Sequence, residues 1–259
     1  MTSAVLHFGC VVTVLGIGSL AYAAEIPQSE RRSGYEMMSP ETKAMQDDDT
    51  ANPATLWVLE GETIWDTKAA GGKSCADCHG DASASMKGVA ARYPAFDATR
   101  GQAIDLEQRI NICRSERQNA TPLPYESREL LALTAFVARQ SRGMPIEQSD
   151  SRMQPAIASG RALFESRQGQ LNLSCAHCHD DNWGKQLAGS VIPQAHPTGY
   201  PIYRLEWQNL GSLQRRLRNC VFGLRAETYP LGAPETVALE AFLMWRARGL
   251  PMDAPAVRP

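Results

Sequence analysis

A five-residue motif occurs twice in this chain and constrains its fold more than any other feature. Residues 75–79 read CADCH, and residues 175–179, one hundred positions later, read CAHCH. The pattern C-x-x-C-H is the attachment motif of c-type haem, in which two cysteines bind the porphyrin and the adjacent histidine binds iron. A zinc knuckle would need four N/S ligands in one lobe, and a redox dithiol would not explain the histidine. The sequence therefore predicts two covalently bound haem c groups, held by Cys75, Cys78, Cys175 and Cys178, with His79 and His179 as axial ligands.

The motifs are parts of a longer internal repeat. Each copy begins with a glycine followed four residues later by an aromatic residue, continues through the haem motif, and reaches an R-x-x-x-C segment. Each copy then ends with an apolar stretch closed by R-G-x-P. The landmarks of the two copies are Gly61, Trp65, Arg109, Cys113 and Pro145, then Gly160, Phe164, Arg216, Cys220 and Pro251. The repeat predicts a mostly α fold of two cytochrome c-like lobes, with long loops around the covalent haems.

Helical periodicity supports this fold class. Short helical patterns precede the haem motifs, and longer ones with one apolar stripe follow the later cysteines. Strand-like alternation is scarce. The predicted helices cover residues 56–67, 127–142, 157–166 and 235–248.

The chain divides into five predicted segments. An apolar run ends in Ala21-Tyr22-Ala23, which is typical of a secretory signal peptide and too short for a membrane span. A polar stretch follows, which we expect to be an extended arm or a segment that contacts a partner, with disorder as the alternative. The predicted segments are a signal peptide (1–24), the arm (25–54), a first haem domain (55–146), a linker (147–155) and a second, catalytic haem domain (156–259).

The signal peptide and the haem motifs predict the location of the mature chain, and its net charge limits its function. Thioether attachment of haem belongs to export compartments, so the signal peptide and the motifs together predict a periplasmic protein without a membrane span in its mature chain. The formal net charge is −2, from 26 basic and 28 acidic side chains. That near-neutral balance argues against a nucleic-acid-binding protein.

The identity of the second axial ligand of each iron says more about the function than the attachment motif does. Both lobes carry a cysteine at the same point, Cys113 and Cys220, and we interpret these as the axial ligands. A Cys113–Cys220 disulfide and two inert buried thiols are the alternatives. Met86 in the first lobe and His196 in the second are rival ligands. Thiolate ligation would lower the haem potential and would leave no open iron position, which directs attention to the sulfur itself.

An arginine precedes each of these cysteines by four residues, and so lies on the same helical face. Arg216 with Arg218 and Arg225 makes the segment around Cys220 positive, a setting that holds a thiolate and attracts an oxyanion. Arg109 has the same spacing to Cys113. The spacing alone therefore does not decide between the two cysteines, and pairing with haem propionates is the alternative role for both arginines.

The doubled pairing of C-x-x-C-H with R-x-x-x-C resembles SoxA, the family of dihaem subunits of the periplasmic L-cysteine S-thiosulfotransferase. The resemblance runs from about Trp57 to Pro251 and is most specific at residues 216–220 and 223–227. It implies that Cys220 is the catalytic residue, a persulfide-forming cysteine as well as an axial ligand. It also implies that Arg216 binds the substrate.

The same resemblance implies the reaction. Thiosulfate would be coupled oxidatively to the C-terminal cysteine of SoxY in the SoxYZ carrier, and two electrons would pass through haem to a c-type cytochrome. A SoxX-like monohaem subunit would be the redox partner. Two other functions stay open: a thiosulfate dehydrogenase that forms tetrathionate, and a plain dihaem electron-transfer cytochrome.

Overall fold

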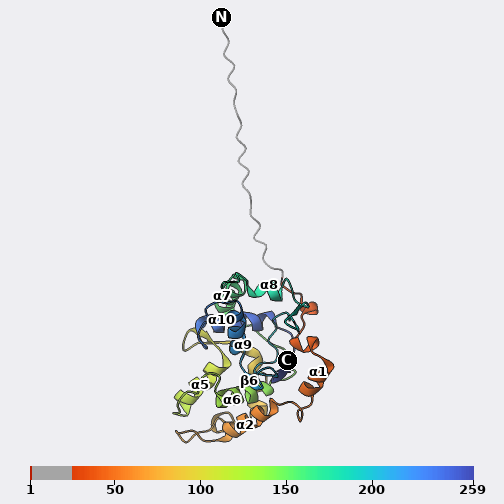
Figure 1. The fold of residues 1–259 in the computed structure, drawn as a ribbon. Coiled ribbons are helices and arrows are strands. Elements are labelled where there is room, and N and C mark those ends of the chain that lie inside the picture. Colours follow the sequence, from red (N-terminus) through yellow and green to blue (C-terminus); the bar gives the residue numbers. More distant parts are fainter. Residues whose placement is uncertain (2–24) are drawn as a thin grey trace.

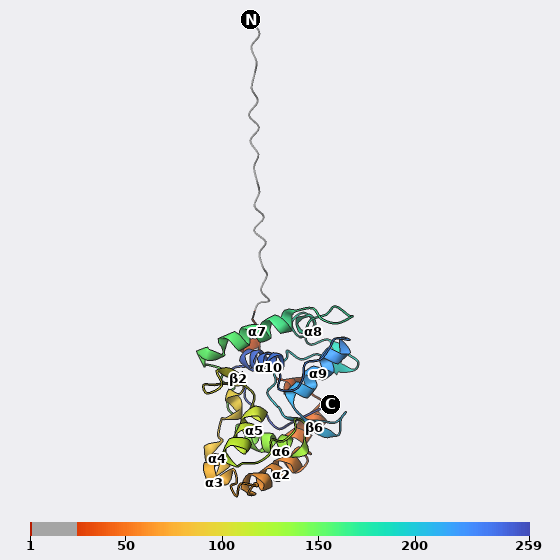
Figure 2. The same cartoon turned by 90° about the vertical axis from the view of Figure 1, so that its left-hand side faces the viewer.

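The computed structural model of the chain describes Met1 and residues 25–259, so the predicted signal peptide lies almost entirely outside the described residues. Two helical halves are stacked on each other, the first half lower and the second half higher in Figures 1 and 2. The fold is mostly α and loop-rich, as the sequence predicts. None of the helices in the described part is long and apolar enough to cross a membrane.

The first half contains a helix pair, the first haem motif, and a small β hairpin that leads into a further helix. Its elements are α2 (Thr55–Asp66), α3 (Ala76–His79), α4 (Ala82–Ser85), the 3-10 helix η3 (Ala90–Arg92), β1 (Ala95–Asp97), β2 (Gln102–Ile104), α5 (Leu106–Arg117) and α6 (Arg128–Arg139). The strands β1 and β2 pair antiparallel, with Ala95 opposite Ile104.

The second half repeats this order, except that a small additional hairpin stands where the first half has α4 and η3. Its elements are η4 (Ser151–Met153), α7 (Gln154–Glu165), α8 (Cys175–His179), β3 (Gln186–Leu187), β4 (Ser190–Val191), β5 (Ile202–Arg204), β6 (Asn209–Gly211), α9 (Leu213–Gly223), α10 (Pro234–Arg246) and β7 (Ala256–Arg258). The hairpin β5–β6 has the register of β1–β2, shifted by the same 107 residues that separate Cys113 from Cys220, with Ile202 opposite Gly211. The C-terminal strand β7 joins β5 in parallel and has no counterpart in the first half.

In each half the first helix packs against the last, α2 against α6 and α7 against α10. A glycine makes each crossing close. A Cβ on Gly61 would meet the carbonyl oxygen of Ala132, and one on Gly160 would meet that of Ala238. These are the glycines that open the two copies of the sequence repeat, so the repeat preserves the closest helix contact of each lobe.

The two hairpins are exchanged between the halves. Leu210 of β6 is fully buried in a core cluster with Trp57 of α2 and Ala132 of α6, both from the first half. Conversely, Phe96 of β1 and Ala103 of β2 pack against the cluster built by α7 and α10. The two lobes therefore interlock and share their cores.

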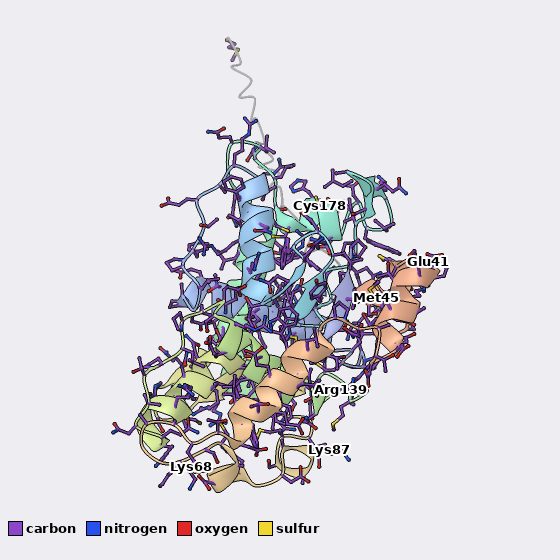
Figure 3. All side chains as sticks on the ribbon, turned by 60° about the horizontal axis from the view of Figure 1, so that its bottom comes forward. Glu41, Met45, Lys68, Lys87, Arg139 and Cys178 are labelled. Atoms are coloured by element: carbon purple, nitrogen blue, oxygen red, sulfur yellow. The ribbon has the colours of Figure 1, made fainter. Side chains whose placement is uncertain are left out.

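The polar segment before Ala54 is folded, so the expectation of an extended arm is wrong. It forms the 3-10 helices η1 (Gln28–Glu30) and η2 (Gly34–Met37) and the helix α1 (Pro40–Asp47). Gln46, 1% exposed, accepts a hydrogen bond from the backbone of Val257 in β7 at 3.1 Å. The labelled side chains of Glu41 and Met45 place α1 along one side of the molecule, far from Lys68 (Figure 3). The polar composition of this segment therefore reflects its solvent-exposed face, and the segment itself is folded against the rest of the protein.

The segment between the lobes is also packed. Ile146 and Met153 are buried, and Gln148 donates a hydrogen bond to the carbonyl of Pro94 at 3.2 Å. The 3-10 helix η4 lies within this stretch, and α7 begins at Gln154.

Between the lobes lies a small cavity of about 40 Å³, with a carboxyl group from each lobe in its lining. Glu107 of α5 and Glu240 of α10 line it. Tyr93 and Tyr200, which precede the two hairpins, line it as well. Burial raises the pKa of Glu240 to about 8, and burial together with the charge of Asp105 raises the pKa of Glu107 well above its ordinary value.

Candidate haem sites and active cysteine

The first haem motif forms the short helix α3 beneath the crossing of α2 and α6. The Trp65 ring lies 5.6 Å from the His79 ring and 5.7 Å from that of Phe136, centroid to centroid. The Trp65 indole donates a hydrogen bond to the carbonyl of Gly80 at 3.2 Å. The His79 ring thus packs on Trp65 while the residue as a whole stays exposed.

The second motif forms α8 in the corresponding place. Phe164 takes the position of Trp65, with its ring centroid 6.3 Å from that of His179 and 5.3 Å from that of Phe242. His179 Nδ1 lies 2.6 Å from the carbonyl oxygen of Pro193 and donates to it, which leaves Nε2 as the nitrogen that can bind iron. Burial lowers the pKa of His179, and a neutral ring is the form that binds metal.

Each of the later cysteines faces the motif of its own lobe. The Cys113 thiol, on α5, interacts electrostatically with Cys75 and Cys78. The charge of Cys220, on α9, raises the pKa of Cys175 and Cys178, second to burial in each case. All six cysteines of the described residues are free thiols, so the structure pairs each late cysteine with a haem motif and not with the other.

These arrangements fit a haem in each lobe. In each lobe the cysteines of the motif lie near a third thiol, and an aromatic ring packs on the histidine; in the second lobe the Pro193 carbonyl also orients the histidine. The two sites lie at opposite ends of the molecule: Cys178 is at the upper end in Figure 3, whereas Lys68 and Lys87, which flank the first motif, are at the lower end. The roles of the eight residues as attachment points and axial ligands stay predictions.

The rival ligands have other surroundings. Met86 packs against the core of the first lobe. His196 donates from Nδ1 to the carbonyl of Arg32 at 2.8 Å, and burial lowers its pKa to about 4. His177 caps α8, where its Nδ1 accepts a hydrogen bond from the Ser174 backbone at 3.0 Å. Asp77 does the same for Ser74 in the first motif, at 2.8 Å.

The two arginines that precede the late cysteines differ in their partners. Arg109 donates to Asp97 at 2.7 Å and to the Tyr93 hydroxyl at 3.2 Å. Arg216 forms no ion pair or hydrogen bond through its side chain with any residue in 25–259. Of the two candidate anion-binding arginines, only Arg216 has its guanidinium unpaired.

The environment of Cys220 also contains a partly buried tyrosine. Burial raises the pKa of Tyr200 to about 12, Arg216 and Arg204 lower it, and Cys220 raises it. Tyr200 is thus close to both the candidate nucleophile and the candidate substrate arginine. Sequence reasoning missed it, although the dipeptide Tyr-Pro recurs at 93–94 and 200–201 with the offset of the late cysteines.

The fold and the two sites define a c-type cytochrome with two interlocked lobes, and the comparisons agree. The family model described as SoxA/TsdA, cytochrome c domain, matches residues 60–146 and 159–252. The chain therefore binds haem c covalently, and it belongs to the SoxA family.

Relatives match along almost the whole chain. The L-cysteine S-thiosulfotransferase subunit SoxA of Pseudaminobacter salicylatoxidans is 39% identical, over 90% of this chain and 82% of that protein. The corresponding subunit of Rhodovulum sulfidophilum is 36% identical, over 88% and 80%. The crystal structure of SoxXA from P. pantotrophus superposes with a TM-score of 0.85 at 32% identity, covering 88% of this chain and 87% of that one. The expected family and fold class are confirmed.

Proposed function

We propose that this chain is the catalytic dihaem subunit of an L-cysteine S-thiosulfotransferase, which couples thiosulfate to a cysteine of a SoxYZ carrier. Its family membership and the names of its relatives support this activity. The observation that carries the assignment to the second lobe is the unpaired guanidinium of Arg216, one helical turn before Cys220. A free arginine fork matches the sulfonate end of thiosulfate in both charge and geometry.

The proposed reaction forms one S–S bond between the outer sulfur of thiosulfate and the sulfur of the carrier cysteine. The carrier thiol loses its proton, and two electrons are released. Bound haem supplies the acceptor for these electrons, which leave to a c-type cytochrome. Cys220 provides the sulfur for a transient S–S link, and Arg216 holds the substrate beside it.

The remaining parts of the proposal follow the repeat. Two haem c groups are bound, one through Cys75, Cys78, His79 and Cys113, and one through Cys175, Cys178, His179 and Cys220. The chain is exported by the segment 1–24 to the periplasm and pairs with a SoxX-like monohaem subunit. We keep the domain limits 55–146 and 156–259, with the hairpin of each domain packed against the other.

Replacing each late cysteine by methionine tests the assignment, because methionine retains a sulfur ligand for iron but cannot form an S–S link. Cys220→Met should abolish carrier-dependent, thiosulfate-dependent reduction of cytochrome c. Cys113→Met should keep it. Mass spectrometry of the Cys220 peptide should show an additional sulfur that reductant removes.

The same assay separates the other functions. Turnover of thiosulfate to tetrathionate without SoxYZ would establish a thiosulfate dehydrogenase instead. Full activity in Cys220→Met, with both haems retained, would reduce the role of Cys220 to tuning the haem potential.

A further inference from the structure

The two cysteine sites are built on the same backbone but differ in the acidic side chains around the thiol. The hairpins and the helices α5 and α9 correspond with the 107-residue offset, so each residue of the first site has a defined counterpart in the second. Arg109 and Cys113 correspond to Arg216 and Cys220. The side chains around them do not correspond: the counterparts of Asp97, Arg100 and Glu116 are Arg204, Trp207 and Gly223.

In the first site, two carboxylates occupy the approach to Cys113. Asp97, whose side chain is 3% exposed, pairs with Arg109 at 2.7 Å and with Arg100 at 3.5 Å. Arg100 also pairs with Glu116. Together these residues line a cavity of about 210 Å³ beside the thiol. Arg109 and Arg100 are thus already paired with carboxylates, whereas Arg117, which also lines the cavity, forms no ion pair among the described residues.

Glu116 and Asp97 both line this cavity together with Cys113. The two carboxylates therefore place negative charge beside the space that an anion near the thiol would have to enter.

In the second site both carboxylates are lost. Arg204 stands in the position of Asp97; its Nη2 pairs at 2.7 Å with Glu206, whose side chain is 64% exposed. Its Nε is buried without a hydrogen-bond partner among the described residues. Gly223 replaces Glu116, and a Cβ built there would have no atom within 4 Å.

We propose that Asp97 and Glu116 exclude anionic sulfur substrates from the first haem site, and that Arg204 and Gly223 in their places open the second site to thiosulfate. This inference rests on the proposed function and adds to it the residues that select one of two pseudo-equivalent cysteines. Thiosulfate carries two negative charges, so a single carboxylate on its approach opposes binding.

Gly223→Glu tests the proposal because it returns the missing carboxylate to a position with open space. Gly223→Gln is the matched control, with nearly the same size and no charge. Thiosulfate is titrated into the oxidised holoprotein, and the electron paramagnetic resonance signal of each haem is followed. Gly223→Glu should weaken the thiosulfate response of the second haem by about tenfold or more relative to Gly223→Gln. Equal affinity of the two variants would overturn the proposal.

The reciprocal change opens the first site. Asp97→Asn combined with Glu116→Gln removes both charges, while an Asn oxygen can still accept the backbone N–H groups of Thr99 and Arg100, which Asp97 now accepts at 2.9 and 3.0 Å. The first haem should then respond to thiosulfate, whereas the first haem of the unaltered protein should not. An unresponsive first haem in this variant would contradict the role given to the two carboxylates.

The controls separate this inference from the proposed function. If thiosulfate leaves the second haem of the unaltered protein unperturbed, the proposed function fails and the inference with it. If the second haem responds, but Gly223→Glu and Gly223→Gln respond alike, only the inference fails.

Discussion

The side-chain amide of Gln214, in α9, donates to the carboxyl group of Asp105, the N-cap of α5, at 2.7 Å. The same amide donates to Glu240 of α10 at 3.1 Å. One glutamine thus joins a fully buried acid of the first lobe to a partly buried acid of the second. Such groups make the stability of the interlocked lobes depend on pH.

Glu240→Gln should remove part of that dependence. Burial raises the pKa of Glu240 from 4.5 to about 8, so the folded chain holds this proton more tightly than the unfolded chain. The stabilisation is complete below pH 4.5 and is lost as the pH rises toward 8. Across that pH window the free energy of unfolding should fall in both proteins. The fall should be smaller in the variant, by roughly 2–4 kcal/mol. Thermal unfolding at pH 5 and pH 8.5 measures this.

Glu129→Gln is the control, because Glu129 is exposed on α6. It should follow the unaltered protein at both pH values. Parallel behaviour of Glu240→Gln and Glu129→Gln would contradict the buried-acid explanation.

Leu210→Ala should destabilise the first lobe, although Leu210 belongs to the second half of the sequence. Leu210 is 0% exposed and packs among α2 and α6 of the first half. Removing it should cost about 2–5 kcal/mol. Hydrogen exchange should accelerate in residues 55–66 and 128–139, whereas Leu187→Ala, at a 63% exposed position, should change nothing there. Loss of protection confined to α7 and α10 would show that the exchanged hairpins do not support the opposite lobe.

Gly160→Ala should destabilise the second lobe. Its new methyl group would meet the Ala238 carbonyl and lie 2.8 Å from Phe242 Cβ, where α7 crosses α10. We expect a loss of about 1–3 kcal/mol, measured by thermal unfolding. Gly223→Ala, at a helical glycine with open space, is the control and should be neutral or slightly stabilising. Equal losses in both variants would mean that the close helix crossing is not the cause.

Arg216→Gln and Arg109→Gln should have different effects, although the two arginines are equivalent in the repeat. Arg216 is unpaired, so its loss should raise the KM for thiosulfate by about tenfold or more, because a charge-assisted contact is removed. Loss of Arg109 leaves the buried Asp97 without its closest cation, so stability should fall while the KM stays unchanged. Steady-state kinetics and thermal unfolding of both variants check this, and a similar rise in KM for both would refute it.

The sequence was sufficient to predict the helices and the residues that gather in each lobe. The predicted helix 127–142 is α6, from Arg128 to Arg139, and 235–248 is α10, from Pro234 to Arg246. Local signals define these elements: an apolar stripe, an N-cap serine in one and an N-terminal proline in the other. Cys113 and Cys220 reach their motifs because the repeat specifies the same lobe twice.

Long-range packing was not readable from those patterns. The docking of residues 25–54 depends on buried amides such as Gln46, whose partners lie at the far end of the chain. The exchange of hairpins depends on single apolar residues such as Leu210, whose alternation is too short to register as a strand. The contrast between Asp97 and Arg204 was present in the sequence, but only the hairpin register showed that they occupy equivalent positions.

The reciprocal exchange of hairpins has a consequence for how such a chain could arise. Fusing two copies of a single-lobe cytochrome whose dimer swapped its hairpins would give this connectivity directly, since each copy already depended on the other for part of its core. After fusion the copies no longer share one gene sequence, so symmetry no longer forces both thiols into the same surroundings. One copy can keep its carboxylates and a protected cysteine while the other loses them and gains a reactive one. The interlocked architecture thus allows the two lobes of a duplicated protein to take on different functions while they remain bound to each other through shared cores.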